Sequence, residues 1–370
     1  MTTTTTGTPT GVVPGEPTAP ATPGAKSRRS GGHLGSYLLI RFLLIFPTIF
    51  ILVTTVFVLM RSTGDPITAA LGGRLTHDQL QERIHAAGYD RPILVQYWDY
   101  LTNLFHGDFG TTISTNRPVT EVVLTYGAAT LELAFYALLV ALLVGIPLGR
   151  IAAARRDQGV DASLRVSGIV AYATPVFFAG ILLKLVFSVW LGWLPVAGRA
   201  STDAQIAIQR NGAGTGIYLI DALSTGDPSV VWDVLQHAVL PALALGLLTG
   251  GIFLRLVRTN VIGTLSTGYV EAARSRGVNE RRLLRQHAWR PALVPIITVI
   301  GLQIALLLSG AVLTETTFEW KGLGFQLVQF LLARDFVAVQ GLVVLLAVVV
   351  ALTNFIVDVI AALVDPRIKY

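Results

Sequence analysis

The sequence predicts an all-α polytopic membrane protein, and three observations lead to this fold class. Of the 370 residues, 52% are apolar and only 14% are charged, a balance too apolar for a single soluble domain. Six apolar windows are each long enough to cross a bilayer core of ~30 Å. Cysteine is absent and the six histidines are scattered, so no disulfide framework is available and a metal site is not expected.

The chain begins with a tail, residues 1–36, that is rich in Thr, Pro and Gly. This composition cannot bury enough apolar surface to fold, so we expect the tail to be disordered. The apolar run that follows, 37–60, superficially resembles a signal peptide. It is long enough to span a bilayer, however, and no small-residue cleavage site follows it, so we expect an uncleaved first span.

The predicted spans lie at 37–60, 126–152, 166–191, 237–260, 292–315 and 338–364. Six spans place both termini on the same side of the membrane. Lys and Arg number 17 in the two tails, the 150–165 loop and the 255–290 segment, against 9 in the remaining loops, which are longer in total. The positive-inside rule therefore predicts that both termini lie in the cytoplasm. The net charge of +6 needs no nucleic-acid partner to explain it.

Two long insertions, 61–125 and 192–236, are predicted on the outer side, with a shorter one at 316–337. In the first insertion Thr76 precedes a helical pattern as an N-cap would, which indicates a small α-rich extracytoplasmic subdomain. The second contains a glycine-rich run, 211–216, that lacks the preceding strand and the lysine of a phosphate-binding loop. We interpret that run as a flexible loop.

The predicted organisation is a tail over 1–36, a first span with the subdomain over 37–125, and a core of five spans over 126–370. None of the four lysines is preceded by Gly and followed by Ser or Thr, so the chain has no P-loop and we do not expect it to hydrolyse ATP itself. The HExxH and GxSxG motifs are also absent. The sequence predicts a protein that is not an enzyme and has no cofactor of its own.

A basic, helix-prone segment, 261–291, separates the fourth and fifth spans. The residues from 269 to 276 favour a helix, with Glu271 near the N-terminus, where the helix dipole prefers an anion. Gly277 then permits a sharp turn, since glycine adopts positive φ without strain. Asn279 is positioned to cap a second helix over 280–289, and Pro291 would open the next span.

Two interpretations of this segment remain open. A solvated positive-inside loop would account for the charge alone. The elbow, the cap and six apolar residues favour a surface that docks to another protein. Those residues are Tyr269, Val270, Ala272, Ala273, Leu283 and Leu284.

At these positions the chain resembles a known family. Glu271, Ala272 and Ala273 followed by Gly277 are similar to the EAA coupling loop of ABC-importer permeases. Further motifs resemble the B-type permease of dipeptide and oligopeptide importers, in order over 37–370. They lie at 43–48, 64–66, 107–110, 117–119, 145–149, 192–195, 240–242, 322–324, 334–336, 340–341, 354 with 358, and 365–367. One departure is Lys321, where the family commonly has proline.

The resemblance implies an ABC type I importer permease in a bacterial plasma membrane. Its expected partners are a second, homologous permease, an extracytoplasmic substrate-binding protein and two cytoplasmic ATPase subunits, which would hold the ATP and Mg. The resemblance also implies the residues that couple to the ATPase. These are Glu271, Ala272, Ala273, Arg274, Arg276 and Gly277.

The resemblance implies import of dipeptides or oligopeptides, with haem, a nickel chelate or glutathione as alternative substrates. Two functions of a different class remain open. An ATP-independent channel or carrier would also have six spans, and a membrane scaffold could carry a basic docking loop.

Some ionisable residues fall within predicted spans, where a charge costs ~2.5–3.5 kcal/mol at the helix centre on insertion scales, and three of them suggest a specific role. For Glu132 we expect a role in the translocation path or in packing, rather than contact with lipid. Lys184 either lines the path or extends its amine to the membrane surface. Asp358 is predicted to form a structural ion pair with arginines of the 261–291 segment.

Overall fold

The computed structural model describes residues 34–364, apart from a few side chains within its helices, and these residues are helical with no strand. The helices before the central core are α1 (Leu34–Ser62), α2 (Pro66–Leu71), α3 (His77–Ala86) and α4 (Ile93–Phe105). The core begins with α5 (Val119–Ala154), α6 (Gly159–Ala173), α7 (Val176–Leu183), the π-helix η1 (Lys184–Trp190), α8 (Thr202–Asn211), α9 (Tyr218–Ser224) and α10 (Pro228–Leu265). It continues with α11 (Gly268–Ser275), α12 (Glu280–Arg282), the π-helix η2 (Leu283–Ala288), α13 (Trp289–Phe318), α14 (Leu323–Leu332) and α15 (Phe336–Val364).

The all-α membrane fold is confirmed, and four of the six predicted spans are continuous helices: α1, α5, α10 and α15. The first helix begins at Leu34, so the last three residues of the predicted disordered tail are helical. The rest of that tail, and the motif at 365–367, lie outside the described residues.

The third predicted span, 166–191, is not one straight helix. α6 and the helix formed by α7 and η1 meet at an angle of 104°. Pro175 causes the break, because proline donates no backbone hydrogen bond and forces the residue before it out of the helical region. Thr174 accordingly has an extended backbone (φ −77°, ψ 125°). Its hydroxyl donates to the carbonyl of Val170 (2.7 Å) and so closes the end of α6.

The fifth span is also bent, by 48° between Glu280–Leu293 and Pro295–Leu308. A proline within a helix removes one backbone hydrogen bond and bends the axis, and Pro295 lies at this position.

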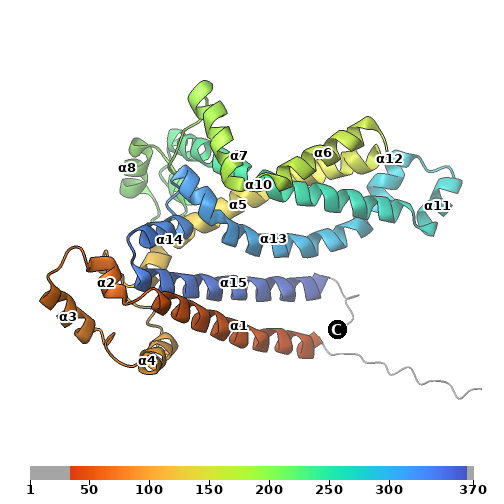
Figure 1. Cartoon of the computed structure of the whole chain (residues 1–370). Coiled ribbons are helices and arrows are strands. Elements are labelled where there is room, and N and C mark those ends of the chain that lie inside the picture. Colours follow the sequence, from red (N-terminus) through yellow and green to blue (C-terminus); the bar gives the residue numbers. More distant parts are fainter. Residues whose placement is uncertain (1–33, 365–370) are drawn as a thin grey trace, which may run out of the picture.

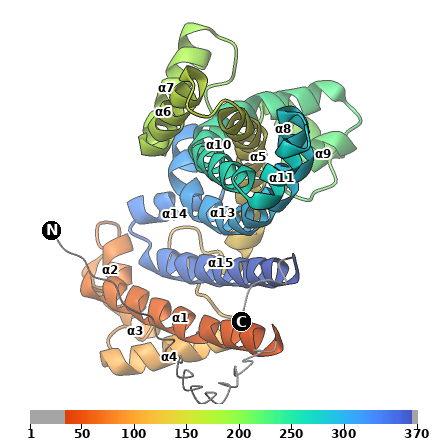
Figure 2. The ribbon, with the colours of Figure 1, turned by 90° about the vertical axis from the view of Figure 1, so that its right-hand side faces the viewer.

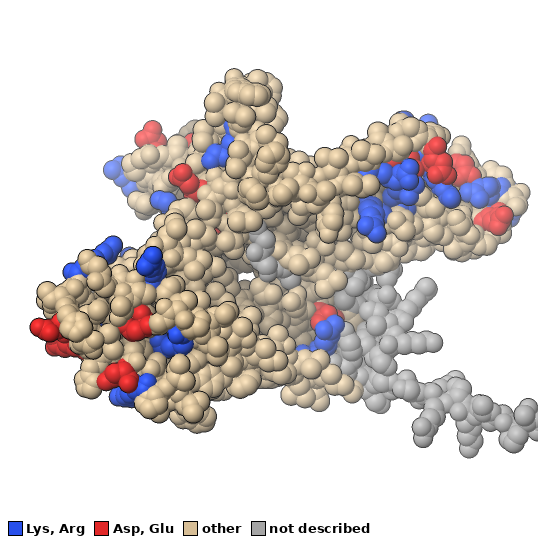
Figure 3. All heavy atoms as spheres, viewed as in Figure 1, with Lys and Arg blue, Asp and Glu red and all other residues tan. Residues whose placement is uncertain are grey.

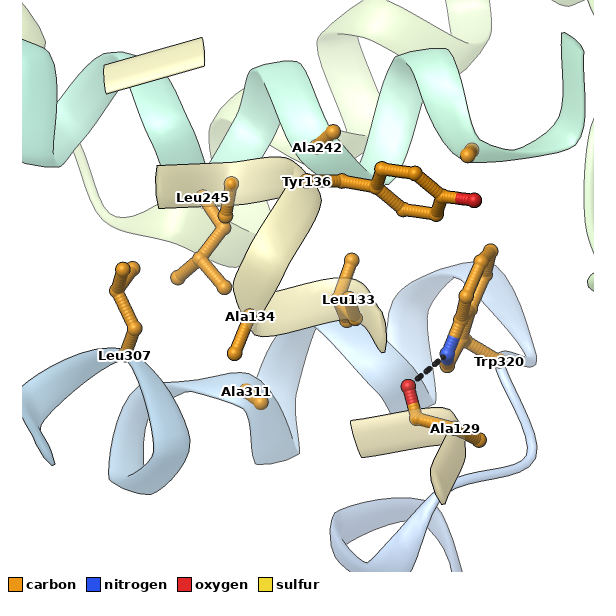
Figure 4. Close-up of a cluster of buried hydrophobic side chains, with 11 residues drawn as sticks. Ala129, Leu133, Ala134, Tyr136, Ala242, Leu245, Leu307, Ala311 and Trp320 are labelled. Carbon is orange, nitrogen blue, oxygen red and sulfur yellow. Dashed lines mark hydrogen bonds between the residues drawn. The ribbon is translucent and has the colours of Figure 1, made fainter. Parts of the chain in front are cut away.

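Helices α5 and α10 form the centre of the bundle and approach each other through glycine. A Cβ on Gly145 would lie 2.6 Å from the carbonyl oxygen of Gly250, and one on Gly246 would lie 2.6 Å from that of Ala137. Figure 4 shows the buried cluster beside this contact, in which the Trp320 indole donates to the carbonyl of Ala129 (2.8 Å). Small residues at the interface are what allow membrane helices to pack this closely.

We predict that Gly145→Ala destabilises the protein by about 1–3 kcal/mol, the usual cost of overpacking. The added methyl would lie 2.6 Å from a backbone oxygen that has no rotamer to change. The matched control is Gly263→Ala in α10, the helix that packs against α5, where a Cβ meets nothing within 4 Å. The measurement is the thermal unfolding midpoint in detergent. Equal midpoints for the two variants would contradict the packing argument.

The two ends of the bundle differ in charge and in connections. The first residues of α1, the last residues of α15 and the elbow of α11 and α12 lie at the same end, on the right of Figure 1. We call this end the basic end. The opposite end carries the long connections α2–α4 and α8–α9, and we call it the insertion end. In Figure 3 the charged side chains gather at these two ends, and the belt between them is almost free of charge.

The α-rich subdomain expected after the first span consists of α2, α3 and α4. Before α3, the backbone amide of Thr76 donates to the Gln79 side chain (3.2 Å), so the predicted helix start is correct. The glycine-rich run 211–216 is not a free loop: the amides of Thr215 and Gly216 donate to the carboxylate of Asp221 (2.8 and 3.0 Å). A buried carboxylate of the protein itself organises this loop.

Candidate functional site

The elbow of the 261–291 segment is built from a short helix and a left-handed glycine, as predicted. Gly277 follows α11 with a φ of +82°. Its amide donates to the carbonyl of Arg274 (2.9 Å), and the amide of Val278 donates to that of Ala273 (3.3 Å). These two bonds form a Schellman motif, which satisfies the last carbonyls of a helix and reverses the chain sharply.

The apolar residues of the segment divide into two groups. Val270, Ala273 and Leu283 are buried and pack together, with Leu265 and Val278 at their edge. The prediction that all six apolar residues form a docking surface is therefore wrong. Half of them pack between the two arms of the elbow and hold the arms together.

The predicted coupling residues are likewise not equivalent. Ala273 is only 3% exposed and faces the interior of the elbow. The other five, Glu271, Ala272, Arg274, Arg276 and Gly277, are exposed at the basic end. Tyr269, beside them, is half exposed. A partner protein would therefore contact one polar face of α11 and the turn after it.

Ionic contacts stiffen this face. Arg274 lies across the elbow from Glu280, with Nε 2.5 Å from one carboxylate oxygen and the terminal nitrogen 3.3 Å from the other. The hydrogen bond to Glu280 raises the pKa of Arg274 above its ordinary value. Arg276 turns back and donates from Nε to the carbonyl of Ala272 (3.2 Å). Both pairs are exposed, so each contributes little to stability and serves mainly to orient the side chains.

The second arm begins as predicted, because the Asn279 side chain accepts from the amide of Arg281 (3.0 Å). It does not end at residue 289, however. α12 and η2 run directly into α13, and Pro291 lies inside that helix instead of opening it. Proline cannot donate to the carbonyl four residues earlier, that of His287. The hydroxyl of Tyr269 donates to this carbonyl (3.1 Å) and so ties α11 to the fifth span.

Charged side chains join the spans to one another at the basic end, beside the elbow. Asp161, fully buried at the start of α6, accepts two hydrogen bonds from Arg258 of α10 (2.6 and 2.7 Å). Arg150 of α5 stacks on the ring of Trp289 at 4.5 Å from its centroid. Between the ends of α5 and α10 and the elbow lies a cavity of about 510 Å³, which Glu271 and Arg274 help to line.

Glu132 lies in a buried ion pair at the insertion end. The residue is 4% exposed, and a terminal guanidinium nitrogen of Arg199 lies 2.5 Å from its carboxylate. The same carboxylate accepts from the amides of Tyr218 and Leu219 (3.2 and 2.8 Å) and from the hydroxyl of Tyr136 (3.1 Å). These contacts are those of the packing role expected for this residue, because they tie α5 to Arg199 and to the start of α9; the role in the translocation path stays a prediction.

Lys184 begins the π-helix η1 and is half-buried. Its amine donates to the carbonyl of Thr317 (2.8 Å) and lies 5.6 Å from the ring centroid of Phe318. Asp358 does form an ion pair, but the predicted partner is wrong. It lies 3.3 Å from Arg41, because α15 packs along α1 and not against the 261–291 segment.

Sequence reasoning missed several buried charged residues, and three of them make the contacts described next. Arg199 completes the pair with Glu132, and its guanidinium also lies 3.7 Å from the ring centroid of Tyr218. Glu315, fully buried, accepts from the hydroxyl of Thr130 (2.7 Å) and the amide of Phe325 (2.9 Å). Asp161 is the third. Glu132 gave a signal, since a carboxylate in an apolar window requires a partner, and Glu315, the last residue of the window 292–315, carried the same signal.

The fold and this site define a class: a multi-span membrane protein that presents a braced, basic elbow between its fourth and fifth spans. A family described as the binding-protein-dependent transport system inner membrane component matches residues 145–370, and the N-terminal part of such membrane components matches residues 35–133. The chain belongs to this family of transport-system membrane components.

Characterised relatives cover nearly the whole chain. The di/tripeptide transport system permease DppB of Pseudomonas aeruginosa is 37% identical over 337 residues, which is 90% of this chain and 99% of that protein. The probable D,D-dipeptide transport system permease DdpB of Escherichia coli is 40% identical over 307 residues, 82% of this chain and 88% of that protein. The oligopeptide transport system permease AppB of Bacillus subtilis is 31% identical, covering 91% of this chain and 100% of that protein.

Among solved structures, a chain of the inward-facing MetNI methionine ABC transporter matches with a TM-score of 0.46 and 17% identity. The match covers 64% of this chain and 93% of that one.

Proposed function

We propose that this chain is one permease of an ATP-driven importer of dipeptides or oligopeptides in the bacterial plasma membrane. The observation that carries the proposal is the sequence similarity to peptide permeases, 37% over 90% of the chain in one case. The elbow at the basic end supports it, because an importer permease needs an exposed element through which an ATPase can act.

The proposed orientation places the basic end in the cytoplasm. The ends of α1 and α15 that lead to the two termini lie at that end, together with α11. The excess of Lys and Arg in the connections at this end supports the same orientation.

The chain is proposed to work with four other subunits: a second, homologous permease as its heterodimer partner, two cytoplasmic ATPases and an extracytoplasmic substrate-binding protein. ATP and Mg would be held by the ATPases, since the chain has no P-loop lysine. Hydrolysis would then be a property of the partners, and this chain would only transmit its effect.

The mechanism follows from how the elbow is connected. A partner that binds the exposed face of α11 equally well in both of its states would transmit nothing, so the contact must differ between them. Movement of α11 passes to the fifth span through Tyr269 and through the continuous helix from α12 to α13. It passes to α10 through the short turn at Ser266 and Thr267.

The test is uptake of a radiolabelled dipeptide by cells that lack only this chain. We expect uptake to be lost on deletion and restored by the wild-type gene, and unlabelled peptide to compete with the label. The tagged chain should also co-purify with two Walker-motif ATPases and a second permease. Competition by haem, a nickel chelate or glutathione, but not by peptide, would assign another substrate, and the absence of ATPases would reject the importer.

A further inference from the structure

Helix α4, in the insertion after the first span, has an apolar side that nothing in the described chain covers. Leu94, Trp98 and Phe105 are 77%, 70% and 89% exposed. Their spacing, four and then seven residues, places them on the same side of a helix. Three large apolar groups in a row on an extramembrane helix require a partner, because such contiguous patches mark interaction surfaces.

The opposite side of α4 is polar. Asp99, Asn103 and His106 follow one another at four and three residues, so they also share a side. The carboxylate of Asp99 lies 3.4 Å from the guanidinium of Arg91, and the ring of His106 contacts the carbonyl of Thr102 at 2.7 Å. The helix is therefore amphipathic, with its apolar side free and its polar side suited to water.

A third side of α4 attaches it to α1. The ring centroids of Tyr97 and Tyr100 lie 5.1 and 5.6 Å from that of Phe57, and the Tyr97 hydroxyl lies 2.7 Å from that of Thr54. Figures 1 and 2 both show α4 beside α1, on the side away from α15.

These contacts fix the depth of α4. Thr54 and Phe57 belong to the candidate span Leu38–Ser62. Thr54 precedes the last residue of that span by two turns of helix, or about 12 Å at ~1.5 Å per residue. A helix held against α1 at this level cannot lie entirely above the membrane, because the attachment itself is below the end of the span.

We propose that α4 is an interfacial helix whose apolar side, Leu94, Trp98 and Phe105, rests among the lipids of the leaflet at the insertion end. The helix to which α4 is attached, α1, also exposes apolar side chains at this level, among them Ile51 and Val58. Tryptophan is the side chain most typical of the boundary between headgroups and acyl chains. An amphipathic helix with this arrangement lies in the plane of the interface, with its polar side in water.

The absence of cysteine from the chain allows a direct test. Trp98→Cys and Phe105→Cys are labelled with a nitroxide in the complete transporter, in which any cysteine of the other subunits has been replaced by serine, in nanodiscs of phosphatidylcholine and phosphatidylglycerol. Matched controls are Asn103→Cys and His106→Cys on the polar side of the same helix. Accessibility is measured by power saturation with oxygen, which concentrates in lipid, and with a water-soluble nickel chelate.

We expect the ratio of oxygen to nickel-chelate accessibility to be above one at positions 98 and 105 and below one at 103 and 106. Nickel-chelate accessibility at 98 and 105 equal to that of the controls would show that the apolar side faces water and would overturn the proposal. Shielding of 98 and 105 from both reagents would also overturn it, because the cover would then be a protein subunit. Neither result depends on which substrate the transporter carries.

Discussion

Replacing Arg199 by alanine is expected to destabilise the protein by about 3–5 kcal/mol, the usual cost of leaving one member of a buried ion pair without its partner. Glu132 would keep three hydrogen-bond donors but lose the only cation described in contact with its carboxylate. Because Arg199 also donates to the carbonyl of Gly216, the connection between α8 and α9 would loosen as well (2.8 Å in the intact protein). The measurement is the thermal unfolding midpoint of the purified transporter.

Two further variants separate the ion pair from a general effect on the insertion. Arg210→Ala removes an exposed arginine of the same insertion and should leave the midpoint unchanged. The double variant Glu132→Gln with Arg199→Met removes both charges and should recover much of the loss, since replacing a whole buried pair is often close to neutral. If Arg199→Ala and Arg210→Ala unfolded at the same temperature, the pair would have no structural importance.

The second large effect is expected at the elbow. Gly277→Val should lower peptide transport roughly tenfold while ATP hydrolysis continues, because a side chain at positive φ costs ~1–2 kcal/mol and ~1.4 kcal/mol corresponds to a factor of ten. The φ of +82° is required by the Schellman motif that joins α11 to the second arm. Opening this turn would displace the exposed face of α11 while leaving every span intact.

The control for this prediction is at the same position. Gly277→Asn should keep most of the transport activity, since asparagine tolerates the left-handed region far better than valine. The measurement is the ratio of peptide transported to ATP hydrolysed in proteoliposomes. Equal ratios for the valine and asparagine variants would show that the backbone geometry of the elbow does not matter for coupling.

The sequence was a good guide wherever one residue type determines local structure. Apolar length predicted the four continuous spans and the apolar segments that form the two bent helix pairs. Gly277 and Asn279 predicted the elbow, because each acts on the backbone next to it. Pro175 carried the signal for the break in the third span, but a window that averages hydropathy over about 20 residues passes over a single proline.

Contacts between distant residues were not predictable in the same way. Arg199 and Glu132 are separated by 67 positions, and nothing in either neighbourhood specifies the other. Asp358 showed that a carboxylate within a span needs a cation, but not that α1 would supply Arg41. In the sequence, Val270 and Leu283 could not be distinguished from apolar residues that dock to a partner. Burial inside a small hairpin depends on how its two arms pack against each other.

The break between α6 and α7 has a consequence for the assembled complex. The last carbonyls of α6 lose their helical donors at Pro175, and backbone that is unpaired at membrane depth is tolerated only against protein or water. In the described chain Tyr172, Phe177 and Phe178 around this break are largely uncovered. Lipid offers no donors to these carbonyls, so in the membrane we expect the surface around residues 174 and 175 to face protein or water.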